Sequence, residues 1–344
     1  MKKARKIPEQ TGNHPGGRSR SALLSTQRDT PKTGEGVAGA IRASRRLVAR
    51  DLIRNRYVYL MVLPAVVYYI VFHYGPMYGL IVAFKDFRPA LGFHGSPWIG
   101  IRHFVDFFSS HYVWRLVRNT FLLSFYDLLF GFPAPILLAL LLNEVRSARF
   151  KRTVQTLTYL PYFISVVIIA GIIVDFTRRT GVINDFVALF GGRRVTFLTR
   201  PEYFRAVFVV SNIWQFVGWG SIIYLAALTN IDPELYQAAM IDGAGRFRQV
   251  WHISVPGISP VIIILLILQL GNIMTVGFEK VLLLYNPLTY STADIIQTFV
   301  YRRGLVQFEF SYSAAVGLVN SVINFTLLVV ANYAARKYSE TSLW

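Results

Sequence analysis

The feature that most constrains this sequence is a series of apolar blocks, each long enough for a helix to cross a lipid bilayer. A bilayer core about 30 Å thick needs roughly 20 apolar residues of helix, and a helix satisfies the backbone polar groups within its own segment. Six blocks reach that length, so the sequence predicts an all-α membrane protein with six transmembrane helices. Their expected ranges are 57–84, 116–142, 156–176, 206–228, 256–276 and 313–335.

Positive charge is concentrated before the first block. Of the 36 Lys and Arg residues, 14 lie in residues 1–56, and the whole chain has a net charge of +18. Basic residues next to a first span hold the N-terminus in the cytoplasm and contact anionic lipid heads. We therefore expect membrane lipid, and no nucleic acid, as the partner of this charge. With six spans, both termini of a multi-pass inner-membrane protein are then cytoplasmic.

The composition of the ends predicts their character. Residues 1–40 are rich in Gly, Ser, Thr, Pro and basic residues, which predicts a disordered cytoplasmic tail. Residues 41–56 contain six arginines and predict an amphipathic helix on the inner membrane face. Residues 57–335 form the expected six-span domain, and residues 336–344 a cytoplasmic C-terminus.

Several kinds of chemistry are not expected. The chain has no cysteine and its six histidines are scattered, so we expect neither disulfides nor a metal site. No glycine-rich loop ends in Gly-Lys-Ser or Gly-Lys-Thr, so no nucleotide-binding domain of its own is expected. We therefore expect no catalytic residue and no cofactor bound by this chain.

The segment between the fourth and fifth blocks, residues 229–256, has the features of two helices joined by a turn outside the bilayer. Asp232 suits the N-cap of the first helix, and the Pro and Glu that follow suit its first turn. Gly243 permits the positive φ that a turn after a helix requires. A second helix follows, and Pro256 is expected to close it as the fifth span begins. On these features alone, a docking surface and an ordinary loop both remain open.

A resemblance favours the docking surface. The stretch Gln237-Ala-Ala-Met-Ile-Asp242-Gly-Ala, continuing to Pro256 and Pro260, resembles the signature loop of binding-protein-dependent ABC importer permeases. In that family the pattern is Glu-Ala-Ala, then Asp-Gly-Ala a few residues on, then a hydrophobic stretch that ends in prolines. Gln237 stands where the family usually has Glu, which removes a negative charge from the docking face.

A broader similarity, to maltose-type permeases, covers roughly residues 57–344. The segments concerned are Tyr78–Phe87, Ser96–Gly100, Arg118–Thr120, Leu282–Pro287, Thr298–Arg302 and Ala315–Asn320. The last three look like the branch that imports oligosaccharides and polysaccharide fragments, including acidic sugars of the alginate and pectin type.

The resemblance implies a fold, partners and a docking site. The fold is the type I ABC importer permease fold. The partners are a second permease subunit, expected to form a heterodimer, two ATPase subunits that use ATP and Mg²⁺, and a periplasmic solute-binding protein. The residues expected in the ATPase-docking loop are Glu234, Tyr236, Gln237, Ala238, Ala239, Asp242, Gly243, Ala244, Phe247 and Pro256.

Polar side chains inside apolar spans are costly and are candidates for function. Amides beside aromatic rings suit a sugar path, because hydroxyls need donors and acceptors while sugar C–H faces pack on rings. The candidates for a substrate pathway are Asn212, Trp214, Gln215, Trp219, Tyr224, Gln269, Asn272, Asn320 and Asn324. For any one of them, hydrogen bonding between helices is the competing explanation.

Arginines on the expected outer side favour an acidic substrate, since guanidinium groups bind carboxylates through two hydrogen bonds. They are Arg178, Arg179, Arg193, Arg194, Arg200, Arg205, Arg302 and Arg303. Contacts with the binding protein or with lipid heads remain an equal alternative for these residues.

Two other classes of protein compete with an importer permease. An ion-coupled secondary sugar carrier would show inverted repeats and charged pairs in broken spans, but Asp127 and Asp175 are isolated acids in the sequence. An enzyme of polysaccharide synthesis would need acidic metal or nucleotide-sugar motifs on an inner loop, and none is present. The sequence therefore favours the permease.

Overall fold

The computed structural model describes residues 51, 53–275 and 277–338. The expected tail 1–40, residues 41–50 of the expected interfacial helix and residues 339–344 lie outside the described residues. The chain divides into two compact units, Met1–His73 and Tyr74–Trp344. In the first unit, the described chain forms α2 (Arg56–Tyr69), which contains Pro64 and continues into the π-helical turn η1 (Ile70–Tyr74).

Helices joined by short loops make up the described residues of the second unit. It begins with α3 (Gly75–Met77) and the 3₁₀ helix η2 (Tyr78–Phe84). Its next elements are α4 (Gly92–Gly95), α5 (Arg102–Ser109), α6 (Tyr112–Tyr126), η3 (Asp127–Gly131), α7 (Pro133–Glu144), α8 (Ala148–Tyr159), η4 (Leu160–Phe163), α9 (Val166–Thr177), α10 (Val182–Leu189) and η5 (Phe197–Thr199). Its later elements are α11 (Pro201–Thr229), α12 (Pro233–Ile241), α13 (Arg246–Gln249), η6 (Val250–Ser254), α14 (Val255–Gly271), η7 (Ile273–Thr275), α15 (Phe278–Leu284), η8 (Pro287–Thr289), α16 (Tyr290–Ala293), α17 (Ile296–Tyr301), η9 (Arg302–Val306) and α18 (Phe310–Tyr338).

Five helices of the described chain are long and apolar enough to cross a membrane. They are Arg56–Phe84, Tyr112–Glu144, Pro201–Thr229, Arg246–Gly271 and Phe310–Lys337. A sixth crossing requires the pair Ala148–Phe163 and Val166–Leu189, which is bent by 105°. The structure thus gives five to six spans where the sequence predicts six.

The expected third span, 156–176, is not one continuous helix. Its N-terminal part ends in the 3₁₀ turn η4, which contains Pro161, and the next helix begins only at Val166. Ser165 takes an extended conformation as the N-cap, and its hydroxyl accepts a hydrogen bond from the amide of Ile168. A proline and a serine cap therefore break this apolar block, because both favour a new helix start over continuation.

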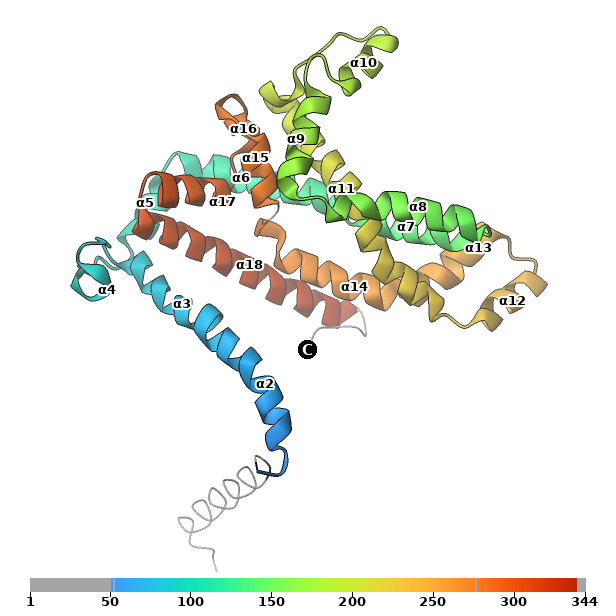
Figure 1. Cartoon of the computed structure of the whole chain (residues 1–344), viewed down its shortest axis with the longest axis horizontal. Helices are drawn as coiled ribbons and strands as arrows, with labels where there is room; N and C mark the ends of the chain where they lie inside the picture. The colour runs from blue at the N-terminus through green and yellow to red at the C-terminus, as the bar shows by residue number, and fades with distance from the viewer. Residues whose placement is uncertain (1–50, 52, 276, 339–344) are drawn as a thin grey trace, which may run out of the picture. The chain divides into compact units, whose positions relative to one another are not determined.

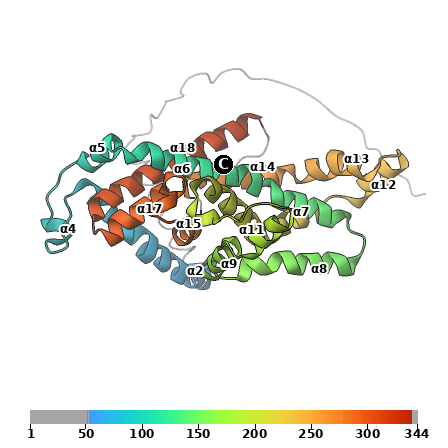
Figure 2. The same ribbon diagram turned by 90° about the horizontal axis from the view of Figure 1, so that it is seen from above.

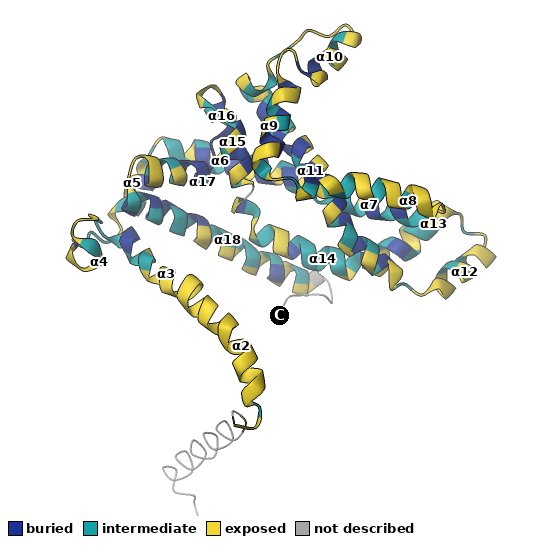
Figure 3. Cartoon of the chain, in the orientation of Figure 1, coloured by how far each residue is buried: buried dark blue, intermediate teal, exposed yellow. Residues whose placement is uncertain are grey.

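Helix α11 lies at the centre of the second unit, where it packs against α7, α8 and α14 (Figures 1 and 2). Gly218 allows α8 to approach closely, since a β-carbon there would collide with the carbonyl of Thr158. Phe204 and Phe208 of α11 are fully buried in the main cluster, against residues of α9 and α15. Figure 3 shows the buried positions gathered where α6, α9, α11 and α15 meet, while α8 and α12 contain no buried residue.

Candidate functional site

The loop 229–256 forms the helix and turn that its sequence predicts. The side chain of Asp232 accepts a hydrogen bond from the amide of Glu234 at 2.9 Å and caps α12. Gly243 has a φ of 75°, in the left-handed region that favours glycine. The amide of Ala244 donates to the carbonyl of Ala239 at 2.8 Å, so the helix ends in a closed turn.

The expected end of the second helix at Pro256 is wrong. The chain is helical without interruption from Arg246 to Gly271, a span of 26 residues. A π-helical turn, η6, ends at Ser254, two residues before Pro256, and the amide of Val255 donates to the carbonyl of Val250, five residues back. The regular hydrogen-bond ladder is already shifted there, so the missing N–H of proline does not end the helix.

A tyrosine fastens this loop to the long helix. The hydroxyl of Tyr236 on α12 hydrogen-bonds the hydroxyl of Ser254 in η6 at 3.0 Å. Ser254 is fully buried. The side-chain amide nitrogen of Gln249 also donates to the carbonyl of Ala244 in the turn, at 2.8 Å. Helix α12 is therefore held to the beginning of the fifth span by its own side chains. The sequence pattern pointed to Tyr236 but missed Ser254.

The solvent-facing side of the loop exposes large apolar side chains, a feature typical of interaction surfaces. These exposed residues are Leu235, Met240, Ile241, Phe247 and Trp251, and Ile241 reaches 88% exposure. Seven of the ten predicted docking residues are exposed, and they are Glu234, Gln237, Ala238, Asp242, Gly243, Phe247 and Pro256. Tyr236, Ala239 and Ala244 are half-buried.

A cavity of about 510 Å³ lies between η3, α11 and α14. It collects five of the predicted pathway residues, which are Asn212, Trp219, Tyr224, Gln269 and Asn272. We call it the central cavity. Trp219 stacks on Tyr162 with ring centroids 4.3 Å apart and 3° between the planes, which gives a flat aromatic surface at its edge. Amide groups and a stacked aromatic pair thus occur together in one site.

A chain of polar contacts that the sequence did not predict enters the central cavity. The amide nitrogen of Asn212 donates to Oδ1 of Asp127 at 2.6 Å. The ammonium group of Lys280 donates to the Asn212 oxygen at 3.1 Å, and Lys280 is 3% exposed. Asp127 lines the cavity and has a hydrogen-bond partner, whereas its sequence position suggested an isolated acid. Lys280 was missed because it follows the fifth span by several residues and returns to the core only through the fold.

Four of the predicted pathway residues lie elsewhere. Trp214 lines a mostly apolar cavity of about 400 Å³ between α9 and α11. Gln215 is buried, at 4% exposure, and does not line the central cavity, although it lies three residues after Asn212. Asn320 and Asn324 line a third cavity along α18.

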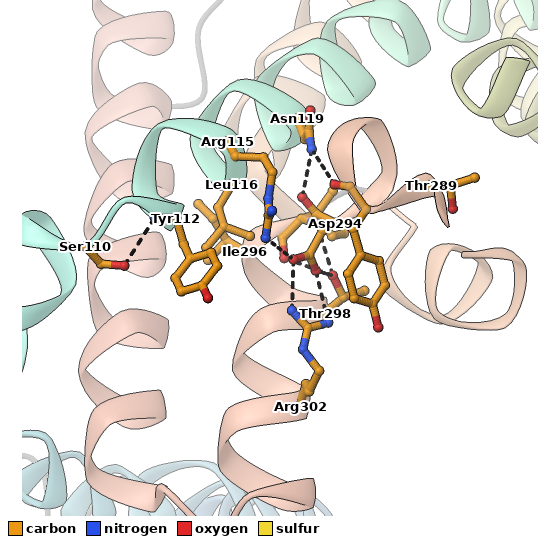
Figure 4. A network of polar contacts seen from close by, with 12 residues as sticks. Ser110, Tyr112, Arg115, Leu116, Asn119, Thr289, Asp294, Ile296, Thr298 and Arg302 are labelled. Atoms are coloured by element: carbon orange, nitrogen blue, oxygen red, sulfur yellow. Dashed lines mark hydrogen bonds and ion pairs between the residues drawn. The ribbon is translucent and has the colours of Figure 1, made fainter. Parts of the chain in front are cut away.

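A buried ion-pair network joins α6 to the segment between the fifth and sixth spans (Figure 4). Asp294, which is fully buried, accepts from Arg302 at 2.8 Å and from Arg115 at 3.3 Å. Thr298 donates to the other oxygen of Asp294 at 2.9 Å. Burial lowers the pKa of Arg302, but its hydrogen bonds and its charge interaction with Asp294 raise this pKa overall above the ordinary value. The guanidinium of Arg302 is therefore fully charged.

The same network contains residues from two of the resemblance segments, Arg118–Thr120 and Thr298–Arg302. The amide nitrogen of Asn119 donates to the backbone carbonyls of Tyr290 and Asp294, at 3.3 and 3.2 Å. The hydroxyl of Thr120 accepts from the amide of Ile296 at 3.0 Å. These segments, far apart in the sequence, therefore build one rigid contact.

Among the residues that the structure describes, no group of three or more His, Asp or Glu side chains lies together as metal ligands.

Comparison with known proteins identifies the family. Residues 122–340, more than half of the chain, match the family described as "Binding-protein-dependent transport system inner membrane component". The chain belongs to this permease family. Members are membrane components of transport systems, and the chain is accordingly a permease component and not itself a catalyst.

Relatives of this permease cover nearly its whole length. Protein LplB of Bacillus subtilis (strain 168) is 48% identical over 85% of this chain and 92% of its own. The polygalacturonan/rhamnogalacturonan transport system permease protein YteP of the same organism is 45% identical over 91% of this chain and 100% of its own. A chain from the crystal structure of a bacterial alginate ABC transporter, in complex with alginate pentasaccharide-bound periplasmic protein, superposes with a TM-score of 0.79 at 43% identity. It covers 86% of this permease and 99% of that chain. The permease therefore has the type I ABC importer fold that its sequence predicts.

Proposed function

We propose that this permease forms half of the transmembrane pathway of an ATP-driven importer of oligosaccharides. A second permease subunit forms the other half, two ATPase subunits dock on the 229–256 loops, and a periplasmic binding protein delivers the sugar. The loop faces the cytoplasm and the segment 277–312 the periplasm. The family assignment removes both competing classes, the ion-coupled carrier and the polysaccharide-synthesis enzyme.

The connection between loop and cavity is the observation on which this proposal depends. Helix α12 is held by the Tyr236–Ser254 hydrogen bond to the 26-residue helix that begins at Arg246. Near the other end of that helix, Gln269 lines the central cavity. At 1.5 Å per residue the helix is about 39 Å long. A push on the exposed side of α12 is therefore transmitted along one continuous helix to the cavity wall.

ATP acts in this scheme by changing populations. ATPase closure can drive transport only if the bound ATPases favour one permease conformation over the other. The exposed apolar residues of the loop, together with Gln237, Ala238 and Asp242, form the surface through which that preference is exerted. Gln237 contributes no charge, so the exposed apolar residues around it are the main source of affinity in this surface.

For the central cavity we propose a role in binding sugar. The amides of Asn212, Gln269 and Asn272 supply donors and acceptors for hydroxyls, and Asp127 supplies a further acceptor. The flat Tyr162–Trp219 pair packs against the C–H face of a sugar ring.

We infer an acidic oligosaccharide as substrate, because YteP is named for polygalacturonan and the similar solved structure holds alginate. The eight arginines of the outer side give weaker support than the sequence suggested. Five of them, Arg178, Arg194, Arg200, Arg302 and Arg303, are ion-paired with carboxylates of this chain. Arg205 instead donates to the side-chain oxygen of Asn119. Arg179 and Arg193 have no carboxylate partner among the described residues and remain available for a uronate.

Uptake by the complete transporter in vesicles tests both levels of the proposal. The vesicles contain both permeases and the ATPases, and the binding protein is added outside with a charged oligouronate or a neutral glucan of equal length. We expect ATP-dependent uptake with preference for the oligouronate. Preference for the neutral sugar would contradict the acidic substrate alone, and uptake that does not depend on ATP would contradict the importer assignment.

A further inference from the structure

A cavity of about 640 Å³ runs along α18, bordered by α17, η9 and η7. We call it the α18 cavity. Its lining extends along α18 from Phe310 to Asn324, which is about 20 Å of helix. It is separate from the central cavity, since the two share no lining residue.

Polar atoms without partners lie in the wall of the α18 cavity. In the described part of the chain, seven buried side-chain nitrogen or oxygen atoms have no hydrogen-bond partner. Three of them belong to residues that line this cavity: Oε1 of Gln297, Oγ of Ser313 and Oδ1 of Asn320. Ser313 is 5% exposed and Asn320 is 6% exposed. Buried polar atoms without partners are rare and costly. Each of these three has less than 1 Å² of accessible surface, so the side chains turn towards the cavity before they hydrogen-bond a bound group.

Neighbouring polar residues on the same wall are satisfied by the chain itself. The hydroxyl of Ser321 donates to the carbonyl of Gly317 at 3.1 Å. The amide of Asn324 accepts from the backbone of Met274 at 2.9 Å and donates to Thr275 at 3.3 Å. The unpartnered atoms are therefore confined to the part of the wall formed by Gln297, Ser313 and Asn320.

A small cavity of about 260 Å³ lies between the α18 cavity and the central cavity. It shares Thr275 with the α18 cavity, and it shares Asp127, Asn212 and Asn272 with the central cavity. It also contains Ser124, whose buried hydroxyl is another of the seven atoms without a partner. Polar residues thus continue from one large cavity to the other.

We propose that the α18 cavity is a second saccharide-binding subsite, in which Gln297, Ser313 and Asn320 bind sugar hydroxyls before the chain enters the central cavity. This inference rests on the proposed function and extends it. It assigns specificity for hydroxyl-rich substrates to α17 and α18, and it adds Gln297 and Ser313 to the pathway residues that the sequence predicted.

The chemistry of the wall favours a saccharide over a lipid chain. The unpartnered amide oxygens need donors, and an acyl chain has none, whereas a sugar presents hydroxyls along its length. Tyr301 and Phe310 provide apolar rings on the same wall. The unpartnered atoms therefore match an oligosaccharide that extends from this cavity towards the central one.

Uptake by the complete transporter in vesicles, with the variants Asn320→Leu and Gln297→Leu, tests the subsite. Each variant removes a buried acceptor, so the thermal midpoint of the purified transporter should stay unchanged or rise. We expect the KM for the sugar-loaded binding protein to rise, or kcat to fall, by about five- to tenfold, which is the effect of one lost hydrogen bond. Ser321→Ala is the matched control, because its hydroxyl lies on the same cavity but is already satisfied, and it should transport like the wild type.

The other outcomes of this experiment overturn the inference. Wild-type uptake by both leucine variants would show that the cavity holds only water or lipid. Loss of the partner permease from the purified complex would show that the amides form a subunit interface. Failure of the unaltered transporter to take up any oligosaccharide would instead contradict the proposed function.

Chemical protection provides a readout that does not depend on transport. The chain contains no cysteine, so Ser321→Cys places a single thiol of this chain in the α18 cavity. Oligouronate at saturating concentration should slow maleimide labelling of this chain, and it should not slow labelling of Ser109→Cys, which is exposed outside the cavity. Equal labelling rates of the Ser321→Cys variant with and without sugar would contradict the subsite.

Discussion

The docking loop and the buried network around Asp294 differ in how far along the chain their contacts reach. Within the loop, the partners of the turn and of the Tyr236–Ser254 bond are at most 18 residues apart. In the network, Arg115 and Asp294 are 179 residues apart. The loop exposes apolar side chains, in keeping with its proposed docking role, whereas the network is internal and holds distant segments together. The comparison separates a region of local, exposed contacts from one of long-range, buried contacts.

The largest expected effect comes from the network. Asp294→Ala leaves Arg302 and Arg115 without their carboxylate in a buried site, which should destabilise the permease by about 3 kcal/mol. Asp86→Ala is the control, because the Asp86–Arg88 pair is exposed and should contribute less than about 1 kcal/mol. Thermal midpoints and yields of the purified complex measure both. If the Asp294→Ala variant had the same yield and thermal midpoint as the Asp86→Ala variant, a structural role for the network would be contradicted.

The next effect concerns the turn of the loop. Gly243→Val should reduce ATP-coupled uptake at least about tenfold while membrane insertion is unchanged, because a β-branched residue resists a φ of 75°. No atom lies within 4 Å of the added β-carbon, so only the backbone conformation is at issue.

Gly245→Val provides the matched control for this turn. Gly245 has a φ of −67° and is also open to added side-chain atoms. The valine there should retain most of the uptake. If both valine variants transported at the wild-type rate, the turn would have no part in coupling.

A smaller effect separates the central cavity from its surroundings. Trp219→Leu should raise the KM for sugar uptake about fivefold, because the stacked surface with Tyr162 is lost. Trp214→Leu should have little effect, since Trp214 is exposed to a similar extent but lines the apolar cavity. Uptake kinetics with sugar-loaded binding protein distinguish the two variants. Equal KM values for Trp219→Leu and Trp214→Leu would contradict a role of the Tyr162–Trp219 pair in sugar binding.

The difference in contact range also explains what the sequence could predict. The cap at Asp232, the positive φ of Gly243 and five of the apolar spans follow from local residues and were predicted. The break in the third block was not, although Pro161 and Ser165 contained its cause. A count of apolar residues alone does not detect it.

Long-range pairing was beyond the sequence. No spacing rule relates Asp127 to Lys280 or Arg115 to Asp294, because the fold alone brings them together. Helical spacing puts Asn212 and Gln215 on the same face of α11, but only Asn212 lines the central cavity, while Gln215 is buried. Neighbouring helices determine which part of α11 borders the cavity. Pro256 was misjudged because the π-helical turn before it has no sequence signal of its own.

The coupling between loop and cavity is tested most directly by the number of sugar molecules transported per ATP hydrolysed. Tyr236→Phe removes the hydrogen bond to buried Ser254 and should lower this ratio severalfold, for a loss of about 1 kcal/mol, while ATP hydrolysis continues. Ser259→Ala, which removes a hydroxyl bonded only within the same helix, should keep the wild-type ratio. A wild-type ratio in the Tyr236→Phe variant would contradict the transmission of force from α12 to the fifth span.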